Sequence, residues 1–164
     1  MTIKVGDKIP SAKLMQGTAE GPKEVSTDEL FAGKTVVLFG VPGAFTPTCD
    51  TSHLPGFVGA ADRIRKAGIS RIVCATVNDH HVTKRWAEVS DALGKIDFIA
   101  DAHGAFAEAL GLAKDFGDLG RRFARFAMIA KDGVVEQLFV QDVKGVTVSG
   151  APAILLALQG EAVA

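Results

Sequence analysis

The chain has 164 residues, of which 18 are Lys or Arg and 19 are Asp or Glu, so its formal net charge is −1. A chain of this length buries roughly 70% of its unfolded surface, which suffices for a single domain over residues 1–164 without disulfide or metal support. The near-neutral charge argues against a nucleic-acid ligand, and no apolar run reaches the 18 or so residues that a membrane span needs.

Two cysteines are too few for a disulfide scaffold, so each thiol has to be judged by its own surroundings. The first ten residues, MTIKVGDKIP, have neither the apolar segment of a secretory signal nor the Arg- and Ser-rich bias of a transit peptide. We therefore expect a reducing, cytoplasmic setting with no membrane partner.

The first thirty residues alternate turn residues with short apolar pairs and predict edge structure that ends in a helix start, Ser26-Thr27-Asp28-Glu29. The run 35–41 (TVVLFGV) is rich in β-branched residues, as in a strand buried on both faces of a parallel sheet. A helix over 47–67 and a second apolar strand over 69–77 follow. Together these elements predict a βαβ unit.

The rest of the chain predicts a helix over 82–93, a short strand over 95–100, a second helix over 104–111, a hairpin over 124–140 and a last helix over 151–159. The hairpin rests on the turn dipeptide Asp132-Gly133. Pro152 lies near the start of the last helix and Gly160 is expected to end it. This order predicts an α/β fold in which helices cover both faces of a mixed central sheet.

The loop 42–50 (PGAFTPTCD) joins the first buried strand to the first long helix, at the sheet edge where α/β proteins collect ligands. Thr46 is a good N-cap and Pro47 a good first helical residue, which places Cys49 inside the first turn. Unpaired N–H groups and the helix dipole stabilise a thiolate there. Cys49 is therefore a candidate nucleophile, and the alternative is a small buried core residue.

A buried anion requires a cation, and the segment 121–128 (RRFARFAM) offers three arginines. Arg121 and Arg122 follow a glycine and are expected to be solvated loop charges. Arg125 lies between two phenylalanines at the head of an apolar strand, where an unpaired guanidinium is costly. We therefore expect Arg125 to face an anion.

The run 41–57 (VPGAFTPTCDTSHLPGF) resembles the peroxidatic loop of the peroxiredoxins, whose signature Pro-x-x-x-Thr-x-x-Cys coincides with Pro42, Thr46 and Cys49. The segments PGAFTPTC and HLPGF are similar to the type II, or atypical, subfamily with its plant-type and bacterial members. The resemblance continues through VNDHHVTKRWAE, KIDFIADAHGAFAEALGL and RRFARFAMIAKDGVV, the last of which contains Arg125. It therefore covers nearly the whole chain.

The resemblance implies a thioredoxin-like fold and thiol-dependent reduction of hydrogen peroxide and alkyl hydroperoxides, without a cofactor or a metal. By this resemblance Cys49 is the peroxidatic nucleophile that becomes a sulfenic acid, and Thr46 positions the peroxide. Arg125 stabilises the thiolate and Pro42 shields the site. Type II relatives commonly form homodimers near this loop, so a homodimer is also expected.

A sulfenic acid stays reversible only while a second thiol captures it. Val148 occupies the position where some type II members have a resolving cysteine. The remaining thiol, Cys74, is expected about three residues before the end of its strand. At about 3.3 Å per residue it then lies about 10 Å below the loop, whereas a disulfide needs Cα atoms within about 7 Å. We expect Cys74 to be structural, with a resolving role as the alternative. Glutathione with glutaredoxin, or thioredoxin, would then recycle a one-Cys enzyme.

Three other features are interpreted as structural. His53 lies on the helical face of Cys49, which could indicate a Cys–His pair, but we favour packing or capping near Pro55, whose missing N–H kinks the helix. His80 and His81 complete no metal ligand set and are expected in an exposed loop. Trp86 is expected in the core or at an interface.

Two rival functions remain open. A redox sensor or holdase would use the same kind of reactive cysteine, with Cys49 oxidised stoichiometrically and signalling through a partner. A thioredoxin-like disulfide reductase is disfavoured because Thr46 and Ser52 stand where a C-x-x-C partner of Cys49 would be. Steady-state peroxide consumption with a recycled thiol would separate the peroxidase from the sensor.

Overall fold

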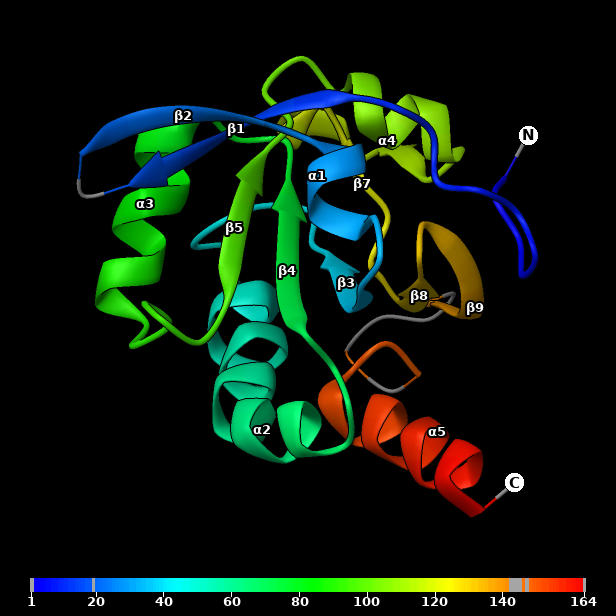
Figure 1. Cartoon of the computed structure of the whole chain (residues 1–164). Helices are drawn as coiled ribbons and strands as arrows, with labels where there is room; N and C mark the ends of the chain where they lie inside the picture. The colour runs from blue at the N-terminus through cyan, green and yellow to red at the C-terminus, as the bar shows by residue number, and fades with distance from the viewer. Residues whose placement is uncertain (1, 19, 142–145, 147, 164) are drawn as a thin grey trace.

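The structure, a computed structural model, describes residues 2–18, 20–141, 146 and 148–163, and its strands form two sheets (Figure 1). The strands are β1 (Lys13–Thr18), β2 (Gly21–Ser26), β3 (Thr35–Gly40), β4 (Arg71–Thr76), β5 (Asp97–Ala100), β6 (Ala113–Asp115), β7 (Arg121–Phe123), β8 (Phe126–Lys131) and β9 (Val134–Val140). The larger sheet has the order β2-β1-β5-β4-β3-β8-β9, and β6 pairs with β7 separately. Strands β3, β4 and β5 are parallel, whereas β8 and β9 continue the sheet antiparallel.

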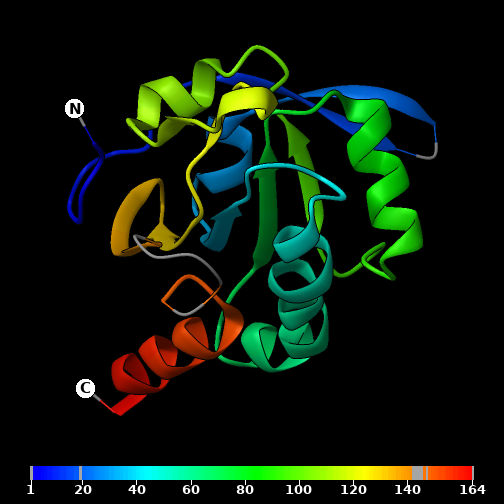
Figure 2. The same cartoon turned by 180° about the vertical axis from the view of Figure 1, so that it is seen from behind.

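Helices lie on both faces of the large sheet, as predicted. They are α1 (Thr27–Phe31), α2 (Leu54–Lys66), α3 (His80–Val89), α4 (Ala105–Leu110) and α5 (Ala151–Val163), with a π turn at Cys49–His53 and a short 3₁₀ turn at Gly117–Leu119. Buried side chains of α2, α3 and α5 share one apolar layer, and those of α1 and α4 share the other. Helices α2 and α5 pack against each other at the bottom of the molecule (Figure 2).

Strand β3 shows why the central sheet is covered on both sides. Its side chains alternate between the two layers, with Val37 and Phe39 facing α2 and with Val36 and Leu38 facing α1. All four are fully buried. At the end of the strand a Cβ on Gly40 would overlap the Phe126 ring, so only glycine lets β8 begin this close to the end of β3.

Several local predictions are confirmed and one is wrong. Ser26 caps α1, its Oγ accepting a hydrogen bond from the Glu29 amide at 3.1 Å. Asp132 and Gly133 have φ values of 50° and 78°, as a tight hairpin turn between β8 and β9 requires. However, α5 runs through to Val163 instead of stopping at residue 160. A single glycine costs a helix only about 1 kcal/mol, so Gly160 does not end it.

The N-terminal segment forms the hairpin β1–β2 at one edge of the sheet, in agreement with the expected edge structure. Strands β6 and β7 were not predicted, because three residues are too few to show a hydrophobic period. The predicted third helix, 82–93, instead begins two residues earlier and ends at Val89. Such shifts are the usual error of boundaries read from sequence.

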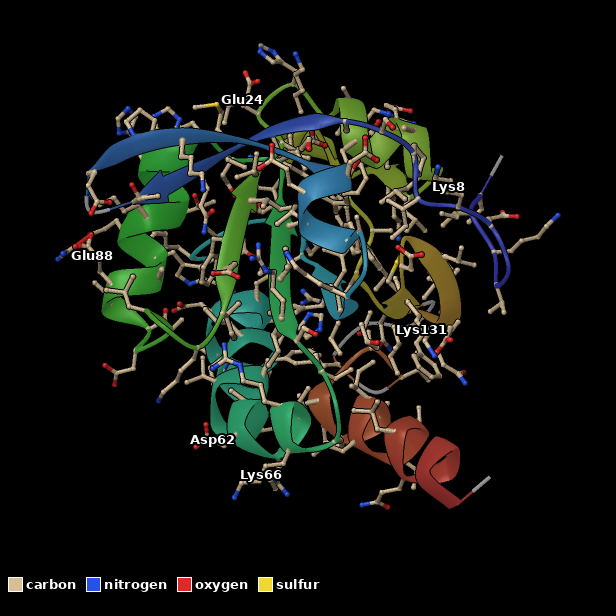
Figure 3. All side chains as sticks on the ribbon, viewed as in Figure 1. Lys8, Glu24, Asp62, Lys66, Glu88 and Lys131 are labelled. Atoms are coloured by element: carbon tan, nitrogen blue, oxygen red, sulfur yellow. The ribbon has the colours of Figure 1, made fainter. Side chains whose placement is uncertain are left out.

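Charged side chains lie on the outside of the helices. Asp62 and Lys66 on α2 and Glu88 on α3 are exposed and point away from the sheet (Figure 3). Within the described residues, none of the helices combines the length and the apolar composition needed to cross a bilayer. The same residues include no group of three or more His, Cys, Asp or Glu side chains that could hold a metal ion.

Candidate active site

The loop after β3 is held in place from two sides. The Ala44 amide donates to Asn78 Oδ1 at 2.9 Å, just beyond the end of β4, and Arg122 Nη1 donates to the Pro42 carbonyl at 3.3 Å. Between these contacts Phe45 has a φ of 64°, a left-handed conformation that is uncommon for a bulky residue. Such strain persists only where neighbouring groups impose it, and it is typical of functional loops.

Helical hydrogen bonding starts at Thr46, as predicted, since its carbonyl accepts from the Asp50 amide at 2.8 Å. The predicted helix 47–67 is not continuous, because the π turn Cys49–His53 precedes α2 (Leu54–Lys66). The Thr46 hydroxyl does not act as the predicted side-chain cap: Oγ1 donates to the Gly43 carbonyl at 2.7 Å. That bond uses the only hydroxyl proton and leaves the oxygen lone pairs as acceptors. Thr46 can therefore receive a hydrogen bond from a ligand O–H group.

Cys49 is the first residue of the π turn Cys49–His53, in which the Leu54 amide bonds to the Cys49 carbonyl. A proline at position 55 cannot donate to a carbonyl four residues earlier, and such interruptions favour a wider turn. The kink that the sequence predicts near Pro55 takes this form. The Cys49 side chain is fully buried at the start of the helix.

Arg125 reaches Cys49 because of the strand register. Strand β8 runs antiparallel to β3 and pairs Phe126 with Gly40, so the residue before β8 lies beside the loop after β3. Arg125 Nη2 donates to Cys49 Sγ at 3.1 Å. The structure thus brings together a guanidinium and a thiol that the sequence separates by 76 positions, and the positive charge stabilises an anion on the sulfur.

His53 joins the same cluster, although the sequence favours a packing or capping role for it. The ring is fully buried, and its centroid lies 5.0 Å from that of Phe39 and 5.6 Å from that of Phe57. The expectation of packing is therefore correct, but His53 Nδ1 also lies 2.8 Å from Arg125 Nη1 and Nε2 lies 2.7 Å from the Ser149 carbonyl. The four-residue spacing from Cys49 was the available signal, and Arg125 bridges the two residues.

The partners of His53 define its protonation. A carbonyl can only accept and a guanidinium can only donate, so Nε2 carries the proton and Nδ1 offers its lone pair to Arg125. Burial lowers the pKa of His53 from 6.5 to about 3; the Ser149 carbonyl acts in the opposite direction and the Arg125 charge lowers it further. The ring is therefore neutral near pH 7.

The other two arginines differ from each other. Arg121 is exposed and forms an ion pair with Glu108, a contact that lowers the pKa of that carboxyl. Arg122 is half-buried, donating to the Leu119 carbonyl at 2.9 Å as well as to Pro42. The prediction of a solvated charge is wrong for Arg122, because the β6–β7 pair places it against the loop.

Cys74 lies within β4, paired with Phe39 of β3 and fully buried, as predicted. Its side chain shares the apolar layer of Cys49, and both thiols are free. Burial raises the pKa of the Cys74 thiol well above its usual value; Cys49 acts in the same direction, while Arg125 opposes it. This thiol remains protonated at neutral pH.

Trp86 is fully buried, as expected, and also has a polar contact. Its Nε1 donates to Asp50 Oδ1 at 2.8 Å, which ties the first turn of the helix to α3. His80 and His81 lie in the first turn of α3 and not in the predicted loop. Their ring centroids are 4.2 Å apart.

Comparisons with known proteins agree over nearly the whole chain. The Redoxin family model matches residues 4–155. Peroxiredoxin-2C of Oryza sativa subsp. japonica is 41% identical over 159 residues, which cover 95% of this chain and 98% of that protein. A reduced Prx3 of Vibrio vulnificus, solved in complex with hydrogen peroxide, is 46% identical with a TM-score of 0.92, covering 96% and 99% of the two chains. An antioxidant protein of Plasmodium falciparum, described as a 1-Cys peroxiredoxin, is 28% identical with a TM-score of 0.89 and the same coverage.

Proposed function

The chain belongs to the redoxin family and is a peroxiredoxin with a thioredoxin-like fold, a thiol-dependent peroxidase, and we propose that Cys49 is its peroxidatic cysteine in a one-Cys mechanism. The main support is the 3.1 Å contact between Arg125 Nη2 and Cys49 Sγ. A buried sulfur with a cationic donor at the start of a helix has the surroundings of a reactive thiolate.

In the proposed reaction the Cys49 thiolate attacks the terminal oxygen of hydrogen peroxide or of an alkyl hydroperoxide. The S–O bond forms while the O–O bond breaks, and two electrons pass from sulfur to the departing oxygen. That oxygen takes up a proton and leaves as water or an alcohol. Cys49 becomes a sulfenic acid.

Three neighbours have distinct proposed roles. Thr46 Oγ1, whose proton is engaged on the Gly43 carbonyl, accepts from the peroxide O–H and aligns the O–O bond with the sulfur. Arg125 donates to the negative charge that develops on the departing oxygen, an interaction that is stronger in the transition state than before it. Pro42, buried at the start of the loop, keeps water from the sulfur.

For resolution, we favour an external thiol. Glutathione attacks the sulfenic sulfur, water leaves, and glutaredoxin then removes the glutathionyl group; direct reduction by thioredoxin is the alternative. One observation supports this choice: Cys74 is fully buried in the sheet with a raised thiol pKa. The resemblance to type II members adds that Val148, which is exposed before α5, stands where some of them have a resolving cysteine. The name of the Plasmodium falciparum neighbour, a 1-Cys peroxiredoxin, agrees with this choice.

The test is peroxidase turnover of the wild type, Cys49→Ser and Cys74→Ala with glutathione plus glutaredoxin and, separately, with a thioredoxin system. We expect no turnover for C49S and wild-type turnover for C74A. Mass spectrometry after one equivalent of peroxide and glutathione should find the glutathione adduct on Cys49. A Cys49–Cys74 disulfide in the wild type, or loss of turnover in a folded C74A variant, would contradict the one-Cys mechanism.

Three further expectations accompany this proposal: a single domain over residues 1–164, a homodimer and a cytoplasmic location. The first two predict one cooperative unfolding transition and a dimeric mass in light scattering. The third predicts that the protein is found in the cytoplasmic fraction of its cells.

A further inference from the structure

Buried polar contacts connect the start of α5 to the Cys49 sulfur. The His53 Nε2 proton is donated to the Ser149 carbonyl at 2.7 Å, Arg125 Nη1 donates to His53 Nδ1 at 2.8 Å, and Arg125 Nη2 donates to Cys49 Sγ at 3.1 Å. Cys49, His53 and Ser149 are all fully buried. One guanidinium therefore divides its two terminal nitrogens between the histidine and the thiol.

We propose that His53 is a positioning residue of the peroxidase, whose Nδ1 lone pair holds the Arg125 guanidinium so that Nη2 points at the Cys49 sulfur. This inference rests on the proposed role of Cys49. It adds a residue that acts through Arg125 and does not touch the peroxide.

A neutral acceptor is chemically suited to this task. A carboxylate at the same place would hold the guanidinium but would also neutralise part of its charge, which weakens the attraction between Arg125 and the sulfur anion. An imidazole lone pair fixes the direction of the N–H bond without adding negative charge. Because burial keeps the pKa of His53 near 3, the lone pair is present throughout the neutral range.

His53 can hold Arg125 because it is itself fixed. Its ring packs against Phe39 and Phe57, and the Ser149 carbonyl selects one tautomer. Ser149 Oγ in turn donates to Gln141 Oε1 at 3.0 Å, and the backbone N–H of Gln141 donates to the backbone carbonyl of Arg125 at 2.8 Å. Arg125 is thus anchored at its backbone and at its head group by one connected network.

Two substitutions separate positioning from packing. His53→Phe keeps a ring between the neighbouring phenylalanines and removes the acceptor, whereas His53→Asn places a carbonyl oxygen close to the position of Nδ1. We expect H53F to slow the reaction of Cys49 with hydrogen peroxide about tenfold to a hundredfold, as displaced supporting groups typically do. H53N should recover most of that loss. Phe106→Leu, a core change on the opposite face of the sheet, is the control for lowered stability.

The rates are measured by stopped-flow fluorescence of Trp86, the only tryptophan, and compared with the rate of Cys49 alkylation by iodoacetamide. Positioning predicts that H53F lowers the ratio of the peroxide rate to the alkylation rate and that F106L leaves it unchanged. Equal rates in H53F and wild type, or equal losses in H53F, H53N and F106L, would overturn the inference.

Nitrogen-15 NMR of the His53 ring gives a readout that does not require activity. The expected signal is a neutral ring protonated at Nε2 from pH 5 to 8. Protonation at Nδ1, or titration within this range, would overturn the inference even in an active enzyme. If the wild type failed to consume peroxide, the proposed function would fail, while the ring signal would still decide whether His53 offers Nδ1 to Arg125.

Discussion

Cys49 and Cys74 carry the same side chain, are both fully buried and share one apolar layer of the sheet. Their partners differ. Cys49 Sγ accepts a hydrogen bond from Arg125 at the start of a helix, whereas burial raises the pKa of the Cys74 thiol well above its usual value within β4. Burial alone disfavours the thiolate of Cys74, whereas the Cys49 sulfur has in addition a fixed cationic donor within hydrogen-bond distance.

The two positions also differ in how easily their backbone can move. Cys74 is paired on both sides, with Phe39 of β3 and Phe98 of β5. Cys49 lies in a π turn next to a strained loop whose Phe45 is 47% exposed. Local opening is easiest where few neighbours are paired, so we expect the Cys49 turn to open more readily than β4.

The largest expected effect separates the two cysteines directly. Cys49→Ser should abolish peroxidase activity, because an alcohol cannot be oxidised by peroxide to the sulfenic state. Cys74→Ala, which removes the other sulfur without burying a new polar atom, should keep wild-type turnover. Peroxide consumption with a recycling thiol measures both. Activity in folded C49S, or its loss in folded C74A, would contradict the assignment of Cys49 as the reactive and Cys74 as the structural cysteine.

Arg125→Lys tests what distinguishes the surroundings of Cys49. Lysine keeps a positive charge but cannot hold His53 and Cys49 at once with a planar fork, so we expect the peroxide rate constant to fall about 10²–10³-fold, the usual cost of losing a transition-state donor. Arg121→Lys is the matched control, since Arg121 is exposed and pairs with Glu108. Equal rate constants for the wild type and R125K would show that the reaction with peroxide does not need the Arg125 guanidinium.

The pH dependence of stability tests the neutral His53 that supports Arg125. Its pKa is 6.5 when unfolded and about 3 when folded, so between these values the unfolded state binds the extra proton. The contribution of neutral His53 to the free energy of unfolding is complete above pH 6.5. It falls by about 1.4 kcal/mol per pH unit as the pH drops toward 3. Urea unfolding at pH 7 and pH 5 measures it. His53→Asn should flatten this dependence, and an unchanged slope in H53N would contradict a buried neutral histidine.

The smallest expected effect concerns the mobility of the Cys49 turn. Trp86→Phe removes the hydrogen bond to Asp50 while keeping an aromatic ring in the core. Opening of the first turn becomes easier, so glutathionylation of the sulfenic acid should accelerate about threefold to tenfold, in line with the net contribution of one typical hydrogen bond. Val89→Ala, at an exposed site on α3, is the control. A slower or unchanged capture rate in W86F would argue against this tether.

Local signals in the sequence predicted most of the fold and part of the site. The apolar run of β3, the Thr46-Pro47 helix start and the Asp132-Gly133 turn each depend on a few adjacent residues, and the structure agrees with them. Arg125 is predictable because a guanidinium between phenylalanines is costly without a partner. These are arguments from residue type and spacing, which a single sequence contains.

What the sequence could not predict depends on contacts between distant segments. The polar partners of His53 come from the segments before β8 and before α5, and Arg122 reaches Pro42 only because β6 and β7 pair. None of these neighbours is visible from local spacing. The sequence predicts Trp86 in the core, but its hydrogen bond to Asp50 depends on the packing of α3 beside the start of the helix.

The most direct test of the contrast between the two thiols is to oxidise the folded wild type at pH 7 with one equivalent of hydrogen peroxide in the presence of dimedone, which traps sulfenic acids. Quantitative peptide mapping then reports the label at each cysteine. We expect nearly all of the label on Cys49, with Cys74 labelled only after unfolding. Comparable labelling of both residues in the folded protein, or labelling of Cys74 alone, would contradict this contrast.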